Sequence, residues 1–271
     1  MIKRVLVLTL ASVVLSGSID TAYPWSEEGL RLFLEKAIEA LDKPLKRFYE
    51  DRELTLVETA SDPSLFPPRL LFEVDRLEPF PFLDLPTDRK RAVGKYGEEA
   101  IEESGDLPWR LIESYDALVE AHRQADFDAV MTHSAEIAHY VGAMYVPVNV
   151  SRNGDGEPTG QHGLRERFDS RLLEVYGEKV RINTPTAFYL DYPEEYAVSI
   201  PRKSYIWVDN LLYFDYLSRL GVQSYDRFYY EGMWLRAKPL LEQLLGGAAL
   251  DTASFWYTAW LTARRPELPK K

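Results

Sequence analysis

The sequence predicts an all-α protein. Apolar residues recur at spacings of three and four in several stretches, which is the spacing of one face of an α-helix. The apolar–polar alternation that is typical of strands is scarce, and clusters of proline, glycine and asparagine separate the periodic stretches. With 271 residues, of which 46% are apolar, the chain has enough material for the core of one large domain.

The first 22 residues are typical of an export signal. Lys3 and Arg4 supply positive charge, an apolar run covers residues 5–15, and small residues follow at 16–18. This run is short for a membrane span, although a retained membrane anchor is the alternative interpretation. We expect cleavage after Ser18 or Ala22. The sequence therefore predicts a secreted or periplasmic protein, with a signal peptide over residues 1–22, a helical domain over 23–271 and no transmembrane segment after signal removal.

The first mature helix is predicted over residues 26–41. Ser26 with the two glutamates after it is a favourable helix start, and the apolar residues that follow repeat at helical spacing. A short helix beginning at Pro44 is expected next. Residues 61–90 contain six prolines, so we predict irregular chain that lies over a helical body.

The remaining helices are predicted from the same signals. A polar helix over 89–103 ends at a Ser-Gly pair, and Pro108 occupies the favoured first turn of the next helix, which runs to about Gln124. The stretch from Phe127 to about Met144 is apolar on several faces, which predicts a central helix. Further elements are a long loop over 147–161, a helix over 163–176, and two or three helices between 202 and 264.

The composition excludes several classes of function. The net charge of −11 repels phosphate backbones, so general nucleic-acid binding is disfavoured. Bound metal ions could still reverse the sign of the field locally. Cysteine is absent from the sequence, so there is no disulfide framework, thiolate metal site or thiol nucleophile.

Two motifs in the middle of the chain resemble a known family. Residues 139–149 read His-Tyr-Val-Gly-Ala-Met-Tyr-Val-Pro-Val-Asn, and residues 160–169 read Gly-Gln-His-Gly-Leu-Arg-Glu-Arg-Phe-Asp. They are similar to the His-Tyr-Val-Gly-Asp-x-His-x-Pro-Leu-His and Gly-x-His-x-Arg-Phe-Glu segments of bacterial members of the zinc-dependent phospholipase C / single-strand nuclease family. Weaker similarities follow in the family's order around Trp25, Asp62, Asp84 and residues 255–260.

The resemblance covers nearly the whole mature chain and implies a specific architecture and chemistry. It implies a multi-helix phospholipase C / nuclease-like domain with long irregular loops. Three zinc ions in a cleft between helices activate water to attack a phosphodiester in that family. Metals suit this reaction because they lower the pKa of bound water and neutralise charge on phosphoryl oxygens.

Most of the family's zinc ligands are replaced in this chain. Three ligands are retained, as Asp62, His139 and Asp169, with Asp62 as the family-equivalent catalytic candidate. The other positions hold Leu30, Pro81, Ala143, Asn149 and Arg165. A catalytic zinc needs about three protein ligands, and a guanidinium does not lose its proton. The resemblance therefore implies no cofactor, or at most one zinc ion.

These replacements predict an exported binding or scaffold protein whose hydrolytic activity is impaired or lost. The cleft that holds the zinc ions in the family is expected to bind a small polar or anionic ligand in this chain. The candidate binding residues are Trp25, Tyr145, Asn149, His162, Arg165 and Glu166. We expect Arg165 to form ion pairs with Asp62, Asp169 or both, in place of the metal charge. Exposure of Arg165 to solvent is the alternative interpretation.

A second function is compatible with the same residues. The retained Asp62, His139 and Asp169 could hold one zinc ion, which would make the chain a metal-dependent phosphodiester hydrolase with a reduced site. In a shifted alignment, His162 and Glu166 stand four residues apart on a helix and would hold the ion with Asn149 or His139. His122 and His133 are interpreted as packing or surface histidines.

Overall fold

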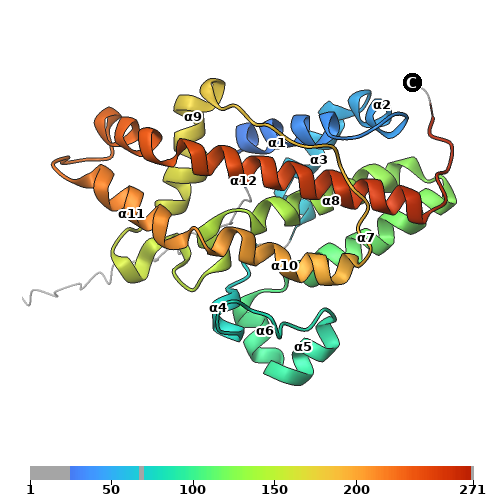
Figure 1. Cartoon of the computed structure of the whole chain (residues 1–271), viewed down its shortest axis with the longest axis horizontal. Coiled ribbons are helices and arrows are strands. Elements are labelled where there is room, and N and C mark those ends of the chain that lie inside the picture. Colours follow the sequence, from blue (N-terminus) through green and yellow to red (C-terminus); the bar gives the residue numbers. More distant parts are fainter. Residues whose placement is uncertain (1–24, 67–69, 270–271) are drawn as a thin grey trace, which may run out of the picture.

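The computed structural model describes residues 25–66 and 70–269, and every regular element in these ranges is a helix (Figure 1). The predicted all-α class is therefore confirmed. The predicted signal peptide, residues 1–22, lies outside the described residues. Among the described helices, none is both long and apolar enough to cross a membrane.

Three long helices form the body of the protein. α12 (Arg227–Thr262) runs along the longest axis of the molecule (Figure 1), and α7 (Leu107–Gln124) and α8 (Phe127–Met144) pack against it and against each other. The turn between α7 and α8 is made by Ala125, which adopts the left-handed conformation with φ 54°. Residues 137–144 of α8 are all buried, so this helix is central, as its apolar faces predicted.

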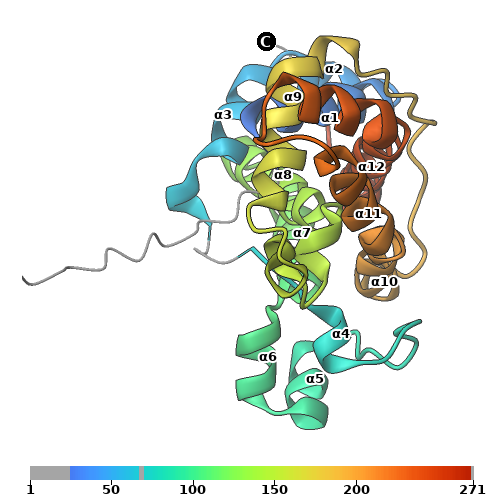
Figure 2. The ribbon, with the colours of Figure 1, turned by 90° about the vertical axis from the view of Figure 1, so that its left-hand side faces the viewer.

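The shorter elements cover this body. Within them lie a π-helix over Glu166–Arg171 and 3₁₀ turns at Pro63–Leu65, Pro147–Val150, Gly154–Thr159 and Gly177–Lys179. The α-helices are α1 (Glu27–Glu39), α2 (Leu45–Glu50), α3 (Glu53–Ser61), α4 (Val74–Leu77), α5 (Arg89–Tyr96), α6 (Glu98–Ser104), α9 (Leu172–Tyr176), α10 (Pro193–Tyr205) and α11 (Val208–Arg219). Figure 2 shows α4, α5 and α6 as a small lobe that projects from the body.

Local chemistry explains where several helices begin and end. Ser26 caps α1, since its Oγ accepts a hydrogen bond from the backbone N–H of Gly29 at 3.3 Å. The single helix predicted over 89–103 is instead two helices, because Gly97 interrupts it with φ 88°. Gly105 has φ 90° and lies so close to Leu71 that a Cβ would stand 1.8 Å from its carbonyl oxygen, so only glycine fits.

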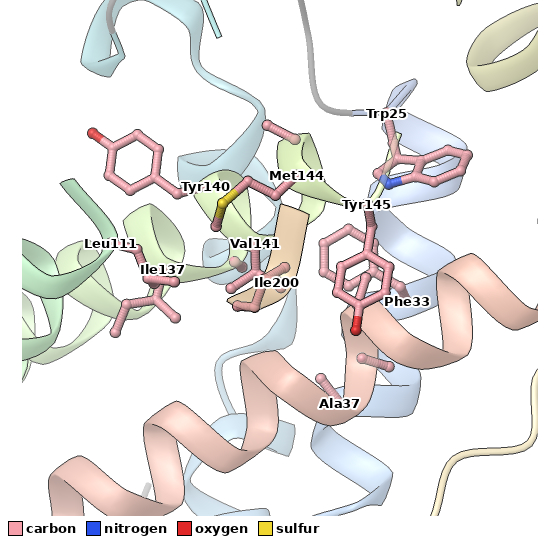
Figure 3. Close-up of a cluster of buried hydrophobic side chains, with 14 of the residues drawn as sticks. Trp25, Phe33, Ala37, Leu111, Ile137, Tyr140, Val141, Met144, Tyr145 and Ile200 are labelled. Carbon is pink, nitrogen blue, oxygen red and sulfur yellow. The ribbon is translucent and has the colours of Figure 1, made fainter. Parts of the chain in front are cut away.

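The core surrounds α12, which contacts α1, α7 and α8. Figure 3 shows part of it, with buried side chains from α1, α7, α8 and α10. Phe33 of α1, Val141 and Met144 of α8, Leu111 of α7 and Ile200 of α10 are all inaccessible to solvent. Each such side chain contributes about 1.5–3 kcal/mol by leaving water. α3 packs against both α8 and α1, and the candidate site lies beside α1 and α3.

Candidate functional site

A pocket of about 250 Å³ lies between the start of α1, the end of α3 and the π-helix. We call it the inner pocket, and it is lined by Trp25, Ser26, Glu27, Leu30, Ala60, Ser61 and Ser170. The backbone N–H of Ser26 donates to the carbonyl of Asp169 at 3.4 Å, which ties α1 to the π-helix. The structure thus brings together the segments around Trp25, Asp62 and Asp169 that carry the family resemblance.

Asp169 lies in the π-helix directly behind the pocket wall. Its side chain is buried, and its Oδ1 accepts a hydrogen bond from the hydroxyl of Ser170 at 2.7 Å. Burial raises the pKa of Asp169 to about 7, an effect that outweighs the lowering by Ser170 and by the positive charge of Arg165. Short π-helical segments often occur at functional sites, and this one was not predicted from the sequence.

His139 reaches the same region from α8 but is enclosed. Its Nδ1 lies 2.9 Å from the carbonyl oxygen of Ala60, so Nδ1 carries the proton and Nε2 has the lone pair. The ring of Phe66 stacks on the imidazole with centroids 3.5 Å apart. Nε2 is buried and has no hydrogen-bond partner within the described residues. Burial lowers the pKa of His139 to about 4, so the ring is neutral at neutral pH.

The side chain of Asp62 forms its hydrogen bonds within the turn that follows α3. Its Oδ1 accepts hydrogen bonds from the backbone N–H of Ser64 at 2.9 Å and from the Ser64 hydroxyl at 2.7 Å. These bonds lower the pKa of Asp62, which is exposed to solvent. The carboxylate therefore acts as a cap of the next 3₁₀ turn.

The donor set does not fit the zinc cluster that the resemblance implies. In residues 25–66 and 70–269, no three or more His, Asp or Glu side chains lie close enough together to hold a metal ion. Leu30 lines the pocket with hydrocarbon, and Ala143 is buried. Among the retained family positions, His139 presents an unpartnered Nε2, and one imidazole does not make a site.

Arg165 acts on Asp169 through its charge. Its backbone N–H donates to Oδ1 of Asp155 at 3.0 Å, and its guanidinium contributes to lowering the pKa of Asp169. Within the described part of the chain, no salt bridge joins Arg165 to Asp62 or Asp169, which differs from the predicted ion pairs.

The structure does not bring His162 and Glu166 together as a metal pair. The side chain of His162 is 70% exposed, and its Nδ1 lies 3.9 Å from Glu157. The side chain of Glu166 is 64% exposed and pairs with Arg171 at 3.1 Å. The two side chains therefore have different neighbours on the surface.

Tyr145 and Asn149 belong to the core and do not line the inner pocket. The hydroxyl of Tyr145 donates to Asp251 of α12 at 2.7 Å. The amide of Asn149 donates to the carbonyl of Ala143 at 3.2 Å, while its Oδ1 has no partner among the described residues. Of the predicted binding residues, Trp25 is the one that lines the pocket, with Arg165 acting indirectly.

The serines of the pocket were not predicted as site residues. Ser26, Ser61 and Ser170 line it beside residues that the family pattern identifies, but the family pattern itself does not include them. Their only signal was adjacency, since Ser61 precedes Asp62 and Ser170 follows Asp169.

Two polar clusters, around Asp251 of α12 and Asp215 of α11, were also not predicted. Asp251 accepts hydrogen bonds from Tyr145, from Tyr196 at 2.7 Å and from Lys203 at 2.6 Å. Asp215 likewise accepts hydrogen bonds from Arg167, Tyr229 and Gln161. The partners in each cluster come from distant segments, so no local motif marks them.

Comparisons with known proteins identify no family for this chain. No family model matches the sequence, and no curated protein matches it significantly.

Proposed function

We propose that this chain is an exported helical protein that binds a small polar ligand in the inner pocket. It would be a relative of the zinc-dependent phospholipase C / single-strand nuclease family that has lost the hydrolytic centre. One observation carries the proposal: Nε1 of Trp25 and Oγ of Ser61 are buried and have no hydrogen-bond partner within the described residues. A buried polar group without a partner costs about 1–3 kcal/mol, so a ligand that completes these bonds gains affinity.

The lining of the pocket defines the chemistry of the ligand. The indole of Trp25 offers a donor, and the Ser61 hydroxyl can donate or accept. The hydroxyl of Ser26 can still donate, and that of Ser170 can still accept. Leu30 and Ala60 supply apolar surface, and Glu27 is the one charged side chain of the lining. This lining favours a neutral polar ligand with a carbonyl or hydroxyl oxygen, and it disfavours the anionic alternative.

The six tryptophans provide an internal test. In a ¹⁵N–¹H spectrum, addition of N-acetylglycine amide as a neutral probe should shift the indole N–H resonance of Trp25. The indoles of Trp109, Trp256 and Trp260 already donate to carbonyl oxygens at 3.0–3.1 Å and should not move. Trp207 also lacks a partner among the described residues but does not line the pocket, so it controls for specificity.

The resonance of Trp25 is assigned with Trp25→Phe, and Ser61→Ala serves as a milder variant that keeps the indole. A saturable shift confined to Trp25 and weakened by Ser61→Ala supports the proposal. Equal shifts of all indoles, or no shift of Trp25 at millimolar probe, refute it.

A second function, a one-metal phosphodiester hydrolase, is favoured by His139 alone. Zinc-binding histidines usually donate one ring N–H to a carbonyl or carboxylate and present the other nitrogen to the metal, as the ring of His139 does toward Ala60. Near-stoichiometric zinc, with hydrolysis of bis(4-nitrophenyl) phosphate that a chelator abolishes, would favour this function over ligand binding.

A further inference from the structure

A larger hollow of about 750 Å³ adjoins the inner pocket. We call it the outer groove, and it is lined by Glu27, Arg31, Glu50, Asp51, Arg52, Glu53, Leu54, Thr55 and Val57. Glu27 lines both hollows, so together they follow α1 and α3 from the turn after α2 to the π-helix. The volume of the groove is within the range of small-ligand sites.

The positive side chains of the groove are already engaged. The guanidinium of Arg31 donates to Glu28 at 2.8 and 3.1 Å, and Glu28 is not part of the lining. Arg52 donates to the carbonyl of Phe48 at 3.0 Å and lies over the Phe48 ring at 4.4 Å. Both cations therefore have partners of their own.

The negative side chains of the groove are less engaged. In the part of the chain that the structure describes, Glu27, Asp51 and Glu53 form no salt bridge. Leu54 lines the same groove with 73% of its surface exposed. The groove thus presents carboxylates beside an apolar side chain.

We propose that the inner pocket and the outer groove together bind a short basic peptide. This inference rests on the proposed function of the inner pocket. The 2% exposed Trp25, whose Nε1 lacks a partner among the described residues, would donate to a peptide carbonyl. Lysine or arginine side chains would lie against Asp51 and Glu53, and an apolar side chain would contact Leu54. The acidic groove would attract such a peptide and repel an acidic one.

The test compares two end-blocked, fluorescein-labelled hexapeptides, one of alternating lysine and leucine and one of alternating glutamate and leucine, by fluorescence anisotropy on the purified protein. The lysine peptide should bind at least about 10-fold more tightly, and its affinity should fall as salt screens the charges. Removing both carboxylates with Asp51→Asn and Glu53→Gln should weaken the lysine peptide about 3- to 10-fold.

A matched control removes the same charge elsewhere. Asp209→Asn with Glu231→Gln, both exposed and outside the cleft, should change the affinity less than about 2-fold. Trp25→Phe and Ser61→Ala should weaken both the lysine peptide and N-acetylglycine amide.

The outcomes separate the two proposals. If both peptides bind equally, or the groove double variant binds the lysine peptide unchanged, the basic-peptide inference is wrong while binding in the inner pocket stands. If neither peptide binds, the inference is also refuted. The indole shift with N-acetylglycine amide then tests ligand binding in the inner pocket separately. If Ser61→Ala and Trp25→Phe leave both probes unaffected, both proposals fail.

Discussion

Buried aspartates occur in two regions of this protein, and their surroundings differ. Asp215 of α11 and Asp251 of α12 each accept hydrogen bonds from three other residues, including a cation. Asp169, behind the inner pocket, is bound by the hydroxyl of Ser170 and carries a raised pKa of about 7. The region around Asp169 also contains the orphaned polar atoms of Trp25 and Ser61.

We interpret this difference as one between structural polar groups and the candidate binding groups of the inner pocket. A buried carboxylate that has its donors fixes the packing of the helices that supply them. Polar groups left incomplete within a pocket cost stability, and proteins keep such costs where a ligand or reaction uses them. Variants in the two regions should therefore respond in opposite ways.

The largest effect is expected for the cluster around Asp215. Arg167→Met removes the cation and leaves the Asp215 charge buried, where both side chains of the pair are at most 6% exposed. We expect a loss of about 3–5 kcal/mol in the free energy of unfolding, measured by urea denaturation. Arg171→Met, on the same π-helix, is the control, because Arg171 is 53% exposed and its surface pairs are worth about 0–1 kcal/mol. Equal losses in both variants would contradict the distinction.

The second effect is a pH dependence at Asp169. Its pKa is about 7 in the folded state against 3.8 ordinarily, so the folded protein keeps a proton that the unfolded chain releases. The free energy of unfolding therefore falls as the pH rises from about 4 to about 7, by at most about 4 kcal/mol, and is then constant. Asp169→Asn removes this loss. The free energy of unfolding of the variant, minus that of the wild type, should therefore be larger at pH 7.5 than at pH 4.5.

The free energy of unfolding must be compared between variant and wild type, because two histidines change it with pH in the opposite direction. Burial lowers the pKa of His122 and of His139 to about 4, so their contribution is lost as the pH falls from about 6.5 to about 4. Urea denaturation at both pH values isolates Asp169. A difference that does not change with pH would show that the Asp169 carboxyl titrates normally.

The third effect concerns the cluster around Asp251. Asp251→Asn keeps the shape but removes the charge that accepts from Lys203 and two tyrosines. We expect a loss of about 1–3 kcal/mol, less than for Arg167→Met, because Lys203 is 34% exposed and can turn to water. Thermal and urea unfolding measure it, and an unchanged stability would mean that the cluster does not hold α10 against α12.

The smallest effect is expected within the inner pocket. Ser61→Ala deletes a buried hydroxyl that forms no hydrogen bond within the described residues, so the free energy of unfolding should stay the same or rise, by no more than about 1 kcal/mol. Ser134→Ala is the matched control, because its hydroxyl is bonded to Tyr49 at 2.7 Å in the core, and it should cost about 1–2 kcal/mol. If Ser61→Ala lowers the free energy of unfolding, the Ser61 hydroxyl has a structural role.

Local signals in the sequence predicted the helices well where periodicity and caps agree. The helix from Phe127 to Met144 and the cap at Ser26 are examples. α3 was missed because its apolar stripe is short, and the break at Gly97 was missed because glycine is tolerated inside many helices.

The candidate site was only partly predictable. Family positions led to Trp25 and Asp169, but the enclosure of His139 by Phe66 depends on tertiary packing. The positions of Tyr145 and Asn149 in the core likewise depend on tertiary contacts. Tyr145 donates to Asp251, which is 106 residues away in the sequence, and Asn149 donates to the backbone carbonyl of Ala143. Spacing along a chain does not reveal which side of a helix faces a cleft that several elements build together.

The most direct test of this account is a crystal structure of the protein soaked with zinc and N-acetylglycine amide, with data collected at the zinc absorption edge. The account predicts no zinc peak between α1, α3 and the π-helix, and probe density within hydrogen-bonding distance of Nε1 of Trp25. Zinc peaks held by Asp62, His139 and Asp169, with no probe in the inner pocket, would contradict it.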